Sequence, residues 1–206
     1  MRSDREKNKT TTITQIALFT ALQCVISPFA IVFPFSPVPI SLATLMLYLS
    51  VYILGKNKST ISCGIYLLIG AVGLPVFSGF TGGVGKVLGP TGGYMLGYLF
   101  LVWVSGCFIE KWGGGKRISS AENKNGKGYN RYSYVNCMMQ VMGMVLGTAV
   151  CYLFGSMWLA YQSKLGISAA LTVGVLPFIP GDMIKIVLSV ITGSNVRKRL
   201  IRAGVL

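Results

Sequence analysis

Residues Val175–Gly193 read VLPFIPGDMIKIVLSVITG, an apolar stretch that carries one aspartate and one lysine three positions apart. A charged side chain at the centre of a membrane helix costs about 2.5–3.5 kcal/mol on insertion scales. Asp182 and Lys185 would share one helical face, so they can hold a common ligand or neutralise each other. Pro180 and Gly181 suit a helix start, which places Asp182 in the first turn, beside free backbone N–H groups. We expect either a polar substrate site inside a membrane bundle or an ion pair that locks two helices.

The composition is that of a membrane protein. Of the 206 residues, 52% are hydrophobic and 12% are charged, and the mean hydropathy is +0.63. A soluble domain normally has about a quarter of its residues charged. The net charge of +14 comes from short blocks of cations between apolar runs, not from a separable basic domain, which argues against nucleic-acid binding. The fold class predicted is therefore an all-α integral membrane protein.

Cysteine and histidine usage argues against a metal centre. The five cysteines occur singly in apolar segments, without the CxxC spacing of metal or redox sites. Buried reduced thiols that act as small apolar residues explain them most simply. Histidine, the commonest metal ligand and general base, is absent. We expect neither a catalytic metal nor a cofactor.

Hydropathy divides the chain, taken as a single domain of residues 1–206, into six predicted spans. Their approximate bounds are 13–33, 40–55, 60–78, 94–112, 134–161 and 168–195. Pro28 would kink or end the first span, and Pro177 and Pro180 would break the last. A polar linker of about residues 113–133 is the one stretch expected to be disordered. The prediction is a bundle of six transmembrane helices.

The cations predict the orientation of this bundle. They concentrate in the N-terminal segment, in the loop after the second span, in the polar linker and at the C-terminal end. Lys86 and Lys164 fall on the other side, and Lys185 lies within a span. The positive-inside rule then puts the N- and C-termini in the cytoplasm, which requires an even number of spans.

The glycine-rich loop Gly79–Gly93 matches neither a Walker A sequence nor a dinucleotide fingerprint, so no motif for ATP hydrolysis is visible. Its glycines allow close backbone approach and leave N–H groups accessible. Lys86 and Thr91 add a cation and a hydroxyl that could bind a carboxylate, and Tyr94 is placed to face the outer mouth of a site. The alternative is a flexible external turn.

The connector Phe33–Ser41 carries no charge and three prolines, among them Pro37, two or three positions apart. A stiff, extended and apolar segment of this kind could cover a pocket as a lid, with little ordering entropy to lose. An ordinary short loop between helices accounts for the same residues equally well.

Ala17 and Ala21 form a small-xxx-small pair in the first span. This spacing lets another helix pack closely, so the pair is a candidate partner interface. Small residues are common in membrane helices, however, and the pair is also compatible with the absence of any partner.

Three motifs occur in a fixed order along the chain: FPFSPVPISL at Phe33–Leu42, GPTGGY at Gly89–Tyr94 and LPFIPGDMIK at Leu176–Lys185. Each is weak alone, but the ordered set resembles the BioY family, the biotin-specific substrate-binding (S) components of energy-coupling factor (ECF) transporters. The resemblance extends over nearly the whole chain.

This resemblance implies a six-helix membrane subunit, not an enzyme, that captures biotin from outside the cell. It implies that Asp182 and Lys185 contact the ligand. It also implies that Ala17 and Ala21 contact a transmembrane coupling subunit, which works with a pair of cytoplasmic ATPases. Pro37, Lys86, Thr91 and Tyr94 remain candidate substrate contacts from the residues themselves.

Other functions stay open at this point. Within transport, the chain could be an S component for another vitamin or a solitary biotin carrier. A membrane enzyme would need a nucleophile–base pair or a set of metal carboxylates, yet of the five acidic residues only Asp182 lies in the bilayer, since Glu110 is at the cytoplasmic end of a span. A structural subunit, with Asp182 and Lys185 as a locking pair, is the remaining alternative.

Overall fold

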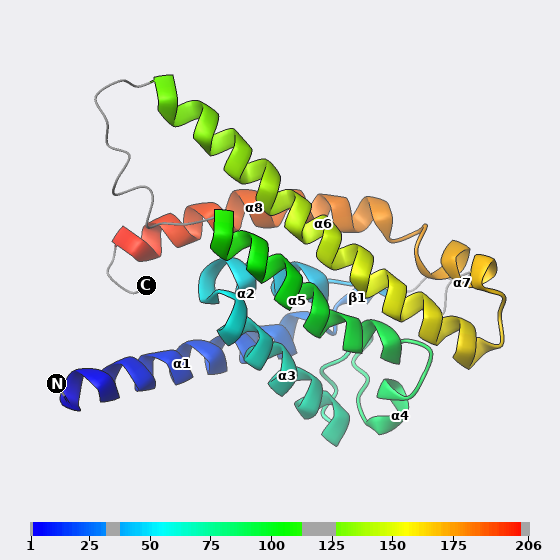
Figure 1. The fold of residues 1–206 in the computed structure, drawn as a ribbon. Helices are drawn as coiled ribbons and strands as arrows, with labels where there is room; N and C mark the ends of the chain where they lie inside the picture. The colour runs from blue at the N-terminus through cyan, green and yellow to red at the C-terminus, as the bar shows by residue number, and fades with distance from the viewer. Residues whose placement is uncertain (1, 32–37, 113–126, 203–206) are drawn as a thin grey trace.

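A computed structural model describes residues 2–31, 38–112 and 127–202 (Figure 1). This part of the chain forms eight helices and a two-stranded antiparallel sheet. In chain order the elements are α1 (Arg2–Ile26), β1 (Ala30–Ile31), β2 (Ile40–Ser41), α2 (Ala43–Leu54), α3 (Lys56–Val72), α4 (Val84–Val87), α5 (Gly92–Trp112), α6 (Lys127–Ser163), α7 (Ile167–Gly174) and α8 (Ile179–Arg202). The protein is thus mostly helical, with the short sheet joining the segments on either side of residues 32–37.

Helices α5 and α6 run side by side and make the most extensive contact in the molecule (Figure 1). Glycines allow this close approach, since an added Cβ at Gly97 would lie 2.9 Å from the Cα of Cys151. One at Gly147 would lie 2.9 Å from the carbonyl oxygen of Leu101. Helix α8 packs against α2 and α6, and α1 packs against α3. Gln15 meets Lys58 in that pair, at 3.0 Å.

Two helical stretches in the described residues are individually long and apolar enough to cross a membrane, Gly92–Trp112 and Asn136–Ser163. A third candidate combines α7 with Ile179–Gly193, which meet at an angle of 49°. The break predicted near Pro177 and Pro180 is therefore present, because α7 ends at Gly174 and α8 begins at Ile179. Helix α2 is apolar but has only 12 residues, about 18 Å of helix.

Several helix ends differ from the predicted bounds. Helix α1 ends at Ile26, not near residue 33, because Pro28 disfavours helical backbone at the residue before it. Helix α3 ends at Val72, not near residue 78, because Gly73 adopts a left-handed conformation (φ 119°) that closes the helix.

Helix α6 begins within the stretch where the sequence predicts a polar linker. Helix α6 begins at Lys127, so residues 127–133 are helical where disorder is predicted, and residues 113–126 lie outside the described residues. A helix formed in the apolar run extends into adjacent polar residues at little cost, since propagation is easier than nucleation. The glycine-rich loop also contains a short helix, α4, and the start of α5.

Candidate functional site

The start of α8 positions the charged pair. Pro180 is the second residue of the helix and Asp182 lies in its first turn, as predicted. The Asp182 amide donates to the carbonyl oxygen of Phe178 at 2.8 Å. Lys185 follows one turn later, and its Nζ lies 2.9 Å from Asp182 Oδ1. Both residues are buried, with 4% and 8% of their surfaces exposed.

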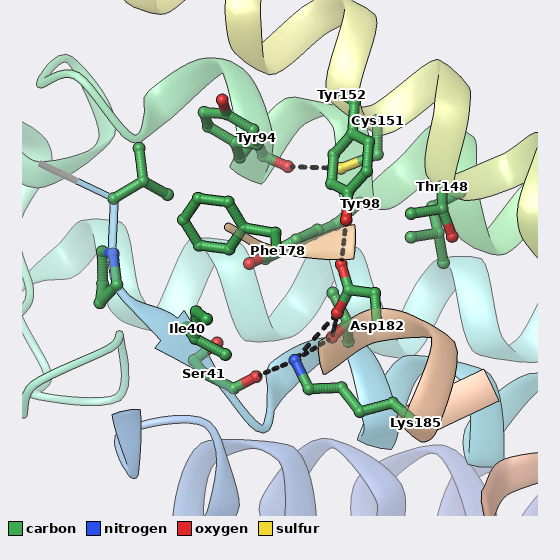
Figure 2. Close-up of a pocket in the computed structure, with 14 residues that line it drawn as sticks. Ile40, Ser41, Tyr94, Tyr98, Thr148, Cys151, Tyr152, Phe178, Asp182 and Lys185 are labelled. Carbon is green, nitrogen blue, oxygen red and sulfur yellow. Dashed lines mark hydrogen bonds and ion pairs between the residues drawn. The ribbon is translucent and has the colours of Figure 1, made fainter. Parts of the chain in front are cut away.

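The ammonium group of Lys185 is fully engaged in the structure. It donates to Asp182 Oδ1 at 2.9 Å, to the carbonyl oxygen of Ser41 at 2.7 Å and to Thr44 Oγ1 at 3.0 Å (Figure 2). An ammonium group has three hydrogens, so these contacts use its whole donor capacity. Burial of this cation is thereby compensated by one charge and two dipoles.

The Asp182 carboxylate accepts hydrogen bonds from residues of three different helices. Its Oδ1 accepts from Lys185 of α8 and, at 3.1 Å, from Thr44 of α2. Its Oδ2 accepts from the Tyr152 hydroxyl of α6 at 2.6 Å. We call Ser41, Thr44, Tyr152, Asp182 and Lys185 the charged cluster. This cluster joins α2, α6 and α8. Its geometry is therefore compatible with both expectations for Asp182 and Lys185, that they bind a ligand or that they form an ion pair that locks helices together.

The charged cluster forms one wall of a cavity of about 40 Å³ (Figure 2). The cavity is partly open, and its lining comes from residues 38–44, α5, α6, the α7–α8 break and α8. Apart from the charged cluster, its lining consists of Val38, Pro39, Ile40, Tyr94, Tyr98, Leu101, Thr148, Cys151 and Phe178. One wall is therefore charged and hydrogen-bonded, while the remainder is mainly aromatic and aliphatic with Thr148 and Cys151 among it, a combination typical of small-molecule sites.

Of the ligand contacts predicted from the sequence, some line this cavity and others do not. Tyr94 lines it, and its hydroxyl donates to the carbonyl oxygen of Gly174 at 2.8 Å. Lys86, on α4, and Thr91, just before α5, are not among the residues that line it. The Thr91 hydroxyl is buried without a hydrogen-bond partner among the described residues. Pro37 lies outside the described residues, although Val38 and Pro39 after it line the cavity.

The sequence analysis missed the hydroxyl groups that complete the charged cluster. Thr44 and Tyr152 are far from Asp182 in sequence, and nothing in their local pattern marks them as its partners. A weak signal exists on α6, where Thr148, Cys151 and Tyr152 follow helical i, i+3, i+4 spacing on the cavity side. Aromatic and small residues at this spacing are equally typical of helix packing, so the signal is not specific.

A second concave surface runs between α1 and α3. This groove of about 430 Å³, the α1–α3 groove, is lined by Ile13, Ile16, Ala17, Thr20, Ala21, Cys24, Ile61, Ile65 and Ile69. Both alanines singled out by their spacing therefore line it. The Thr20 hydroxyl bonds to Ser62 Oγ at 2.9 Å and to the carbonyl oxygen of Ile16 at 2.9 Å, so the groove is apolar in character.

Comparisons with known proteins agree along nearly the whole chain. Residues 2–202 match the BioY family. The chain is 32% identical over 185 residues to "Probable biotin transporter BioY" of Pyrococcus horikoshii, covering 90% of this chain and 95% of that protein. It is 31% identical over 192 residues to "Biotin transporter BioY" of Lactococcus lactis subsp. cremoris, covering 93% of each.

A solved structure shows a similar fold. The crystal structure of "the S-component for biotin from an ECF-type ABC transporter" aligns with a TM-score of 0.75 and 30% identity, covering 93% of each chain. The resemblance inferred from three short motifs therefore extends to the sequence and fold of nearly the whole molecule. This chain belongs to the BioY family and has the fold of an ECF S-component.

Proposed function

We propose that this protein captures biotin for uptake across the cytoplasmic membrane, as the substrate-specific subunit of an ECF-type transporter. The relatives it matches are named biotin transporters. The observation that carries the proposal is the buried Asp182–Lys185 pair on the wall of a cavity whose other walls are mainly aromatic and aliphatic. Intramembrane ionisable residues usually mark substrate pathways.

The chemistry of biotin matches this cavity. Biotin presents a ureido ring with two N–H donors and one carbonyl, an apolar bicycle and a valerate carboxylate. Asp182 can accept from a ureido N–H. Lys185 can donate to the ureido oxygen or the carboxylate if it exchanges one present bond, and its longest is the one to Thr44 at 3.0 Å. The aromatic and aliphatic lining suits the bicycle.

A cavity of about 40 Å³ has room for a few water molecules but not for a bicyclic ligand. We therefore expect residues around the cavity to move when biotin binds. Lys86, Thr91, Tyr94 and the connector around Pro37 remain proposed ligand contacts, and the first two would contribute after such a movement.

The proposed membrane arrangement has six spans: α1, α2, α3, α5, α6 and the broken pair α7–α8. Helices α1 and α3 run in the same direction, because Gln15 meets Lys58 and Thr20 meets Ser62, as expected if α2 crosses back between them. The starts of α1 and α6 and the end of α8 lie toward the same end of the molecule (Figure 1). The cations of these segments favour a cytoplasmic location for that end and for both termini.

The proposed partners are a transmembrane coupling subunit and the cytoplasmic ATPases of an ECF module. The α1–α3 groove supports this proposal, because it is apolar and places Ala17 and Ala21 where a partner helix could approach closely. No motif for ATP hydrolysis is visible in this chain, and in this proposal the ATPase subunits supply the energy for release.

Equilibrium binding of labelled biotin to the purified protein in detergent tests the function, with riboflavin and thiamine as controls. Saturable one-to-one binding without ATP or partners is the expected result. Selective binding of riboflavin or thiamine would instead identify an S component for another vitamin. Biotin uptake in cells that lack the ATPases would identify a solitary carrier.

A further inference from the structure

The two oxygens of Asp182 are held differently. Oδ1 accepts from Lys185 and from Thr44, at 2.9 and 3.1 Å. Oδ2 accepts only from Tyr152 among the described residues, at 2.6 Å. A carboxylate oxygen offers two acceptor sites. Oδ1 is therefore saturated, whereas Oδ2 keeps one acceptor site beside the cavity that Asp182 and Tyr152 both line.

Tyr152 fixes the orientation of that remaining site. The terminal torsion of an aspartate side chain is soft, with broad and roughly two-fold preferences. Lys185 of α8 and Thr44 of α2 hold Oδ1. Tyr152 of α6 reaches Oδ2 from the side of the carboxylate opposite Lys185 (Figure 2). The plane of the carboxylate is thus fixed by donors on both of its oxygens. Among the described residues, the Tyr152 hydroxyl is the only donor to Oδ2.

We propose that Tyr152 is a positioning residue for ligand recognition, holding Asp182 Oδ2 so that its remaining acceptor site receives one ring N–H of the ligand. This inference rests on the proposed function and adds a specificity rule to it. A ligand that lacks this N–H would leave a buried charged oxygen incompletely bonded, which is a strong basis for rejection. The aromatic and aliphatic lining, by contrast, discriminates mainly by shape.

A structural role makes a different prediction. If Tyr152 only ties α6 to α8, removing its hydroxyl would lower stability and would weaken all ligands alike. If it positions Asp182, its effect on affinity must depend on the carboxylate and on the ligand N–H.

The first experiment is a double-mutant cycle on labelled biotin binding to the purified full-length chain. We expect Tyr152→Phe to weaken binding about tenfold. In the Asp182→Asn background, the same substitution should change the residual affinity less than twofold, because the group it positions is gone. An equal loss in both backgrounds, or an unchanged affinity for Tyr152→Phe alone, would overturn the inference.

Tyr66→Phe is the matched control. Tyr66 is a buried tyrosine whose hydroxyl, like that of the partly buried Tyr152, donates a hydrogen bond, here to the carbonyl oxygen of Val76 at 3.3 Å, but it does not line the cavity. We expect it to leave biotin affinity unchanged while reporting on the general effect of losing a buried tyrosine hydroxyl.

A second measurement keeps the inference testable even if Tyr152→Phe does not fold. Biotin methylated on one ureido nitrogen lacks one N–H, and competition assays compare both regioisomers with biotin. We expect the wild-type chain to reject one isomer at least tenfold more strongly than the other, and Tyr152→Phe to reduce this ratio. Equal tolerance of both isomers by the wild type would overturn the inference. Failure of the wild type to bind biotin at all would instead overturn the proposed function.

Discussion

The cavity beside Asp182 and the α1–α3 groove lie in one chain but present opposite chemistry. The cavity is small, about 40 Å³, and one wall is a charged cluster in which each polar group is bonded to another. The groove is about ten times larger, and the one hydroxyl of its lining, on Thr20, is turned to Ser62. The first can select a ligand by its donors and acceptors, while the second can select only by shape.

This difference follows from the apolar surroundings of both regions. A polar group in hydrocarbon is costly unless it is bonded, so charged residues persist only where they form a complete set. Helix association there depends on close packing of small residues instead. Asp182 therefore indicates a site because its charge is unusual in an apolar segment, whereas Ala17 indicates an interface because its side chain is small. Substitutions in one region should therefore leave the function of the other unchanged.

The largest effect is expected for Asp182→Asn. Removing one partner of a buried charge pair costs about 2–5 kcal/mol, because Lys185 is left uncompensated. Biotin affinity of the purified variant should fall at least tenfold in a titration, with normal membrane insertion. Crosslinking of α1 to the coupling subunit should persist. Affinity equal to that of the wild type would remove Asp182 from the site.

A double substitution separates the ligand site from the helix lock. Asp182→Asn combined with Lys185→Met replaces the pair without leaving a lone charge, which is often neutral for stability. We expect thermal stability closer to the wild type than that of Asp182→Asn alone, while biotin affinity stays at least tenfold below that of the wild type. A double variant that is stable and binds biotin would show that the pair serves only packing.

The next largest effect is expected at Gly93, in the α5–α6 contact beside the cavity. An added Cβ would lie 2.2 Å from the Cβ of Trp158 and 2.7 Å from the carbonyl oxygen of Phe154. Gly93→Ala should therefore lower thermal stability, by about 1–3 kcal/mol as for other overpacked sites. Gly85→Ala is the matched control from the same glycine-rich loop, since nothing lies within 4 Å of its added Cβ. Similar melting temperatures for both variants would contradict this packing.

A smaller and different effect is expected in the α1–α3 groove. Ala17→Trp and Ala21→Trp fill the groove, so docking of the coupling subunit should weaken at least tenfold, or by about 1.4 kcal/mol. Biotin affinity of the isolated chain should not change. Leu18→Trp is the control, because Leu18 is 57% exposed on the same helix and does not line the groove. If crosslinking of this chain to the coupling subunit is unchanged in both alanine variants, the α1–α3 groove is not this interface.

The comparison also explains what could be predicted from the sequence. Asp182 and Lys185 stand out because their charges are conspicuous in an apolar segment, and their helical spacing makes the pair a local feature. The break before α8 is local too, since two prolines encode it. Ala17 and Ala21 share a helix face for the same reason. Each of these predictions needs only residues within one helix.

The remainder of the cluster could not be found this way. Thr44 and Tyr152 bond to Asp182 from other helices, and a hydroxyl in a membrane helix has several uses that look alike in sequence. Lys86 and Thr91 are chemically suitable for binding a carboxylate, but the conformation of a glycine-rich loop cannot be predicted from its sequence, so their positions relative to the cavity could not be predicted either. Neither lines the cavity in this structure. The sequence therefore indicates which residues have suitable chemistry, but not which residues of different helices and loops come together in space.

The smallest effect is expected at Lys164, which belongs to neither region. It follows the last residue of α6 with φ 52°, and the amide of Leu165 donates back to the carbonyl oxygen of Ala160 at 3.1 Å. This arrangement is a helix C-terminal motif whose left-handed position favours glycine. Lys164→Gly should therefore raise thermal stability by up to about 1 kcal/mol. Lys164→Ala, which removes the charge but keeps a Cβ, should give no gain. Biotin affinity and subunit docking should be unchanged in both variants, and a change in either would mean that the two regions are not separable as argued.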